Sequence, residues 1–140
     1  MREVQIYTGT NIKSPRAASG RFGYVLATQG KKGLATLEDF GELENVTKNQ
    51  AELKVVAEAL KRMKEPCEIT IFTESSYVAA GMEWLEQWKE NGWITARGKA
   101  VSNKEEWIEL SELIKDHKIT VECKEHEYSS WIRTEITRRK

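Results

Sequence analysis

Three glutamates in this sequence lie where an α/β chain places reactive side chains. Glu52 falls in the first turns of a predicted helix, Glu74 follows a predicted strand, and Glu135 lies in the segment after Cys123. Functional side chains gather at the carboxyl ends of strands, and the partial positive charge of a helix N-terminus favours a carboxylate. Carboxylate oxygens are ligands for a hard divalent cation. Because the chain has 22 acidic residues and most acids are solvated, position alone does not select these three.

Cysteine and histidine chemistry is sparse in this chain. Cys67 and Cys123 each lie in an apolar, strand-like stretch, and we expect both to be buried thiols. The two histidines are His117 and His126, and no CxxC or HxxxH spacing occurs. The sequence therefore predicts no zinc site, whereas an ion held by oxygen ligands remains compatible with it.

Composition indicates one soluble domain covering residues 1–140. The chain is 39% hydrophobic and 31% charged, and its five Trp side chains argue against disorder. Lys plus Arg equals Asp plus Glu at 22 each, which removes the broad positive field of proteins that bind nucleic acid by charge alone. No apolar run approaches the roughly 20 residues of a membrane span, and the start MREVQIYTGT lacks a secretory pattern. We expect a cytoplasmic protein without membrane contact.

Hydrophobic periodicity predicts five strands, three of them before the first helix. Alternating apolar residues and turn signals place these strands at residues 4–8, 22–28, 34–44, 67–72 and 118–123. The polar, basic segment 9–20 is predicted to be the loop between the first two strands. Strands with interspersed helices indicate an α/β domain whose mixed five-stranded sheet is flanked by helices.

The predicted helices follow from spacings of three and four residues. A long helix begins at Thr47 and is stopped by Pro66, and another begins within the pair Ser75 and Ser76. Trp84, Leu85 and Trp88 predict a second short helix that ends at Gly92. After the polar loop 95–103, the SxxE pattern of residues 102–105 predicts a capping box that opens a further helix. The last helix is predicted over residues 131–140.

Several segments together resemble ribonuclease H of the type I bacterial form, in particular its low-GC branch. They are IYTGT at 6–10, NQAEL at 49–53, TESSYV at 73–78, and the Trp-rich stretches GMEWLEQWKENGW at 81–93 and GKAVSNKEEW at 98–107. The resemblance holds in order and spacing over about residues 3–136 and implies the ribonuclease H-like fold. The Trp series is its most specific part, although Trp side chains also pack helix pairs in unrelated proteins.

The resemblance implies hydrolysis of the RNA strand of RNA–DNA hybrids with two Mg²⁺ or Mn²⁺ ions held by four carboxylates. In such a site one ion generates the attacking hydroxide and the other stabilises the leaving oxygen. Three of the family's carboxylate positions fall on Glu52, Glu74 and Glu135, while the first falls on Gly9. Because a ligand shared by both ions would be missing, we expect weak metal binding and impaired activity. Glycine here is compatible with natural degeneration or with a deliberate inactivating change.

The resemblance also implies residues for proton transfer and for substrate binding. His126 matches a family histidine in a flexible loop that assists proton transfer or product release. Contacts with the hybrid are implied for Asn49, Gln50, Ser75, Trp88, Trp93, Arg97 and Lys99. The first three match the groove that receives the hybrid, and the others match a basic handle, although acidic residues surround it here.

Two alternatives to a working nuclease stay open on the sequence. The first is a catalytically inactive nucleic-acid-binding module that keeps the groove and the handle. The second is a protein-interaction subunit, which the neutral charge and the acidic helices would favour. We expect a monomer with the RNA–DNA hybrid as its partner and no obligate protein partner.

Overall fold

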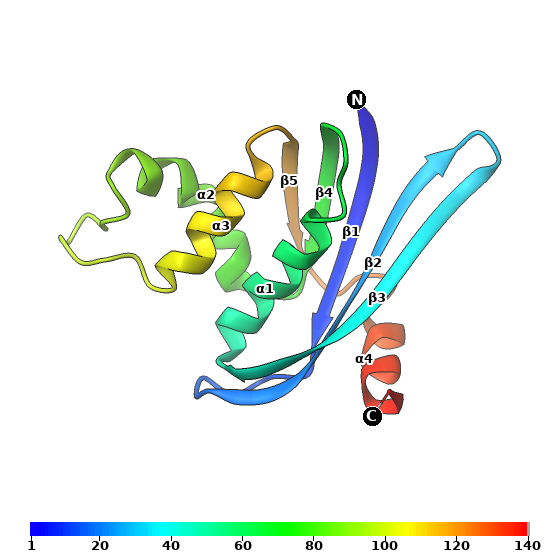
Figure 1. Ribbon diagram of the computed structural model, residues 1–140, viewed down its shortest axis with the longest axis horizontal. Helices are drawn as coiled ribbons and strands as arrows, with labels where there is room; N and C mark the ends of the chain where they lie inside the picture. Colours follow the sequence, from blue (N-terminus) through cyan, green and yellow to red (C-terminus); the bar gives the residue numbers. More distant parts are fainter. Residues whose placement is uncertain (140) are drawn as a thin grey trace.

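The computed structural model describes residues 1–139, which form a mixed sheet in the order β3-β2-β1-β4-β5 (Figure 1). The strands are β1 (Arg2–Thr10), β2 (Ala18–Gly30), β3 (Gly33–Val46), β4 (Cys67–Thr73) and β5 (Lys118–Cys123). The first three pair antiparallel, and β1, β4 and β5 run parallel. The predicted α/β fold with a five-stranded mixed sheet is confirmed.

Helices cover both faces of this sheet. They are α1 (Lys48–Leu60), α2 (Ser76–Glu90), α3 (Lys104–Ile114) and α4 (Ser129–Arg138). Figure 1 shows α1, α2 and α3 on one side of the strands and α4 on the other, below β2 and β3. Among residues 1–139, no helix is both long and apolar enough to traverse a membrane.

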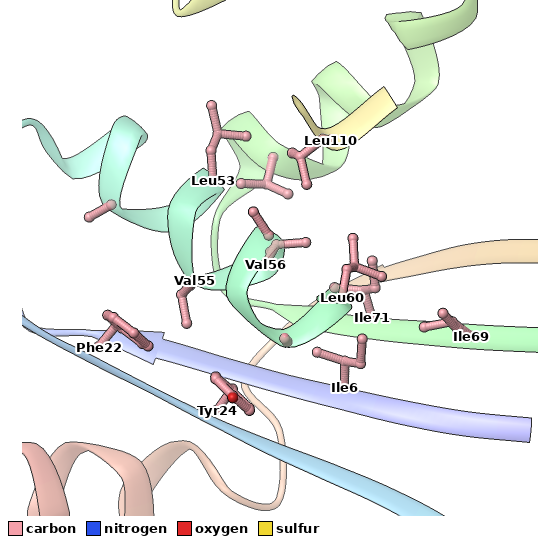
Figure 2. Close-up of a cluster of buried hydrophobic side chains, with 14 of the residues drawn as sticks. Ile6, Phe22, Tyr24, Leu53, Val55, Val56, Leu60, Ile69, Ile71 and Leu110 are labelled. Atoms are coloured by element: carbon pink, nitrogen blue, oxygen red, sulfur yellow. The ribbon is translucent and has the colours of Figure 1, made fainter. Parts of the chain in front are cut away.

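The core consists of two clusters that the central strand β1 separates. Ile6 points toward α1 and lies beneath Leu60 and Ile71 in the larger cluster, as Figure 2 shows. Its neighbour Tyr7 points to the opposite face and joins the smaller cluster beneath α4. Side chains alternate between the faces of a strand, and burying one Leu or Ile contributes about 1.5–3 kcal/mol. The two clusters therefore hold α1 and α4 against opposite faces of the same strand.

The start of α1 is fixed by a reciprocal cap. The Gln50 backbone N–H donates to the Thr47 hydroxyl at 3.2 Å, and the Thr47 backbone N–H donates to the Gln50 side-chain oxygen at 2.9 Å. This capping box satisfies donors that the first helical turn leaves without partners. The prediction of a helix from Thr47 is confirmed, and the helix ends at Leu60, ahead of Pro66.

The segment after Ser75 is one continuous helix, so the predicted separate short helix around Trp84 is wrong. Buried or half-buried Val78, Gly81, Leu85 and Trp88 keep one uninterrupted apolar face along α2. Gly81 lies inside this helix. The Trp107 ring occupies the space into which a side chain at position 81 would project, so only glycine fits there. A glycine inside this helix therefore provides a close helix–helix contact.

The predicted capping box at residues 102–105 is also wrong. Asn103 is the cap of α3, it has a φ of 57°, and its side chain makes no bond to the helix backbone. Instead the Asn103 amide donates to the Tyr77 hydroxyl at 2.9 Å, and the Trp107 indole N–H donates to the same oxygen at 3.1 Å. Tertiary hydrogen bonds to Tyr77 thus replace the local cap that the sequence pattern suggested.

Smaller differences between prediction and structure concern the ends of two strands and the exposure of one cysteine. The β1–β2 loop is shorter than residues 9–20, because β1 continues to Thr10 and β2 begins at Ala18. Cys67 is buried as predicted, but Cys123 is exposed. The prediction for Cys123 was wrong because this residue ends β5, an edge strand that exposes most of its side chains.

Candidate active site

A pocket of about 290 Å³ lies where the carboxyl ends of β1 and β4 meet the first turns of α1 and α4. Parallel neighbouring strands end at the same edge of a sheet, so the residues that follow them converge. The pocket is lined by Thr8, Gly9, Thr10, Ile12, Lys13, Lys48, Glu52, Glu74, Ser129 and Arg133. Two of the predicted acids are thus brought together here.

Glu52 is the more enclosed of these acids. It is 8% exposed and lies on the side of α1 that faces the pocket. Burial raises the pKa of Glu52 to about 7, while Lys48 acts to lower it and Glu74 to raise it. Near neutral pH this carboxyl group therefore exists in both protonation states, which suits a group that exchanges protons.

Glu74 is exposed and has a cationic neighbour that sequence reasoning missed. Arg133 Nη1 lies 3.5 Å from Glu74 Oε2, and Arg133 Nη2 donates to Glu125 Oε1 at 3.2 Å. Arg133 is one turn after Ser129, and the two lie on the same flank of α4. That helical spacing is the only sequence signal that could have placed Arg133 at the pocket.

Glu135 is not brought to the pocket. Its side chain is 10% exposed, and its two carboxylate oxygens accept hydrogen bonds from Arg138 at 2.7 and 2.9 Å. The Arg138 hydrogen bond holds the pKa of Glu135 below its usual value. Because successive residues of a helix are about 100° apart, Glu135 and Arg133 flank the buried Ile132 on different sides. Arg133 takes the side that faces Glu74.

Gly9 lies directly beneath α4. A Cβ on Gly9 would be 2.7 Å from Ile132 Cγ2, which is closer than real side-chain contacts. Gly9 pairs across the sheet with Gly23, and a Cβ there would be 3.2 Å from the same Ile132 atom. Two adjacent glycines thus form a shallow surface on which Ile132 rests. A carboxylate at position 9 would have to displace this contact.

His126 is buried and held by hydrogen bonds, which differs from the flexible-loop histidine that the resemblance implied. Its Nδ1 accepts from the Tyr128 backbone N–H at 3.2 Å, so Nε2 carries the proton and donates to the Thr8 carbonyl at 3.0 Å. The His126 backbone N–H donates to the Ser129 hydroxyl at 2.8 Å. These bonds attach the β5–α4 connection to the end of β1, beside the pocket.

Comparison with known proteins identifies the family to which this chain belongs. A sequence model of the family described as RNase H matches residues 1–128. The chain belongs to the ribonuclease H family. Ribonuclease H of Cupriavidus pinatubonensis is 40% identical over 121 residues, spanning 86% of this chain and 80% of that protein. Ribonuclease H of Caldicellulosiruptor saccharolyticus is 39% identical over 126 residues, spanning 87% and 82%. The recognised resemblance is confirmed.

The fold agrees with this membership. The crystal structure of LC9-RNase H1, a type 1 RNase H with the type 2 active-site motif, matches with a TM-score of 0.80. It covers 99% of this chain and 72% of that chain at 17% identity. At this identity the match concerns the fold, which both chains share.

Ribonuclease H enzymes generally use divalent metal ions, and the pocket of this family member does not fit such a centre. Within residues 1–139, no group of three or more His, Cys, Asp or Glu side chains is placed to hold a metal ion. Gly9 contributes no ligand, and Glu135 is bound to arginines outside the pocket. Arg133 brings a positive charge next to Glu74, where a cation would have to bind. With Arg133 already at this place, the charges of the pocket disfavour the binding of a metal ion there.

The residues that the ribonuclease H resemblance assigns to hybrid binding lie outside the pocket. The Gln50 side chain belongs to the capping box of α1, and Ser75 is the N-cap of α2, where its Oγ accepts from the Val78 N–H at 3.1 Å. Asn49 is half-buried at the start of α1, next to the pocket residue Lys48.

The residues of the predicted handle lie in α2 and in the loop between α2 and α3, away from the pocket. Trp88 packs edge-on against Trp107 with ring centroids 5.5 Å apart, and Trp93 is half-buried with a φ of 67°. Arg97 and Lys99 are exposed in the loop between α2 and α3, which projects from the body of the molecule (Figure 1). Their contact with a hybrid stays a prediction.

Proposed function

We propose that this protein is a ribonuclease H that binds RNA–DNA hybrids and hydrolyses their RNA strand at a strongly reduced rate. The observation that supports this most directly is the pocket of Glu52 and Glu74 at the ends of β1 and β4, in a chain whose match to the family covers residues 1–128. A buried carboxyl group with a pKa of about 7, next to a second carboxylate side chain in the same pocket, is suited to proton transfer.

The reduced rate follows from what the pocket lacks. The family's ions, Mg²⁺ or Mn²⁺, need clustered carboxylates, and here Gly9 and the outlying Glu135 leave Glu52 and Glu74 alone. Displacing a catalytic group by about 1 Å can lower a rate on the order of a hundredfold, and absent ligands have a larger effect. We propose that the protein acts as a cytoplasmic monomer.

The test is cleavage of a hybrid labelled on its RNA strand, at millimolar Mg²⁺ and separately at millimolar Mn²⁺. We expect cleavage at least a hundredfold slower than that of a ribonuclease H with four site carboxylates. E52Q should abolish what remains, whereas E58Q, on the same helix but outside the pocket, should leave it unchanged. Cleavage that E52Q does not affect would contradict the proposed site.

A catalytically inactive hybrid-binding module is the second candidate. The ion pair of Arg133 with Glu74 favours it, because a protein cation already neutralises one of the two pocket acids. Retained hybrid binding without detectable cleavage in either metal would support this module over the slow enzyme.

A further inference from the structure

Cations outnumber carboxylates in the lining of the pocket. Lys13, Lys48 and Arg133 face Glu52 and Glu74 around the same space. Neither lysine forms an ion pair with any side chain of residues 1–139. The partial positive charge at the N-terminus of α1 adds to this field, since Lys48 is the first residue of the helix.

The loop that carries Lys13 is fixed to the pocket. The Lys48 backbone N–H donates to the Ser14 carbonyl at 2.9 Å, which joins the loop to the start of α1. At its other side, the Arg21 backbone N–H donates to Asn11 Oδ1 at 2.7 Å. The buried side chain of Ile12 anchors the loop in the core. Lys13 is therefore carried by a backbone that is held in place before any ligand arrives.

Arg133 keeps donors for a ligand in spite of its two carboxylate neighbours. A guanidinium has five N–H donors, and the contacts with Glu74 and Glu125 involve its two terminal nitrogens, one of them at a distance of 3.5 Å. Both glutamates are exposed, so their ion pairs with Arg133 are weak. A phosphate oxygen can replace Glu74 at the guanidinium with a charge-assisted hydrogen bond.

We propose that this pocket binds a backbone phosphate of nucleic acid directly through Lys13, Lys48 and Arg133, so that binding needs no divalent metal ion. The inference rests on the proposed function in one respect, namely that the ligand is nucleic acid. In a two-ion site the metals supply the positive charge that meets the scissile phosphate. Here the side chains supply it, at the position where the family's metal ligands are missing or displaced.

The experiment measures the affinity for an RNA–DNA hybrid with a fluorescent DNA strand, by anisotropy at low salt, in EDTA and in Mg²⁺. We expect dissociation constants in the two buffers to agree within twofold. K48Q and R133Q should each weaken binding fivefold or more in EDTA. Each should also lower the slope of log affinity against log salt by about one. K64Q, an exposed lysine beyond the far end of α1, should change the affinity less than twofold.

Two results would overturn the inference while leaving the proposed function intact. One is hybrid binding that requires Mg²⁺, and the other is metal-free binding that neither K48Q nor R133Q weakens. Thermal unfolding of each variant separates loss of the contact from loss of the fold.

Absence of hybrid binding in both buffers would instead contradict the proposed function. The pocket is then tested with inorganic phosphate, followed by NMR shifts of the Lys48 and Ser129 amides. Phosphate-dependent shifts that K48Q removes would support the anion site, and unchanged spectra would overturn it.

Discussion

Glu52 is the residue in which structure and chemistry are most closely linked. Its pKa rises from 4.5 to about 7, chiefly because the side chain is buried. The folded protein thus holds this proton more tightly than the unfolded chain does, and stability falls as pH rises through the interval between the two values. The location of Glu52 on a helix was predictable from the apolar spacings of three and four residues after Thr47. Its burial was not, since the pocket around it is formed by segments as distant as the end of β1.

E52Q should therefore stabilise the protein at alkaline pH. Because one pKa unit corresponds to 1.36 kcal/mol, removing the buried charge should raise the free energy of unfolding on the order of 2–3 kcal/mol at pH 8 and little at pH 4.5. Urea unfolding between pH 4.5 and 8 measures this, with E58Q as control. An unchanged pH dependence in E52Q would contradict the burial of an ionisable carboxyl group.

Restoring a carboxylate at position 9 should not restore the site. G9D places a side chain against Ile132, and we expect a loss of stability of about 1–3 kcal/mol from overpacking, without a gain in cleavage. The double variant G9D/I132L removes the obstructing methyl branch and should recover part of the stability, with I132L alone as control. A hundredfold gain in cleavage from G9D alone would show that the pocket accepts metal ions without repacking.

At the level of elements, α4 determines which residues reach the pocket. The sequence predicts this helix, and the spacing of Ile132 and Ile136 predicts its buried face. The flank that faces the pocket depends on the direction in which α4 crosses the sheet, which residues 129–138 do not specify. For this reason the sequence pointed to Glu135, while the structure brings Arg133 to the pocket.

The connection before α4 should depend on His126. H126A removes the hydrogen bond from Nε2 to the Thr8 carbonyl and leaves that buried acceptor without its partner. We expect the free energy of unfolding to fall by about 1–3 kcal/mol, and amide exchange in the first turn of α4 to accelerate. E122A, an exposed change in the preceding strand, is the control. Equal stabilities of the two variants would contradict an anchoring role.

The projecting α2–α3 loop should contribute to binding through charge alone. R97Q/K99Q should weaken hybrid binding a few-fold at low salt and have no measurable effect at high salt, because exposed cations act through phosphate contacts. K31Q/K32Q, in the β2–β3 turn at the opposite side of the molecule in Figure 1, is the matched control. Equal effects of the two double variants would indicate binding without a preferred surface.

For the whole molecule, the balanced composition conceals an uneven distribution of charge. Lys plus Arg equals Asp plus Glu, yet the pocket lining carries three cations against two carboxylates. The order of strands and helices followed from periodicity, because periodicity reflects which residues are buried. The pocket did not follow in the same way, since its lining comes from segments as far apart as Thr8 and Arg133.

The resting of Ile132 on the glycine pair has an evolutionary implication. An ancestor with an acidic side chain at position 9 could lose it in one step, after which a branched residue could settle onto the vacated strand. Regaining an acidic residue at position 9 would then require a smaller or differently shaped residue at position 132 first. That change by itself would open a void in the smaller cluster beneath α4. The packing of Ile132 against Gly9 would thus oppose the return of a carboxylate at position 9 by a single substitution.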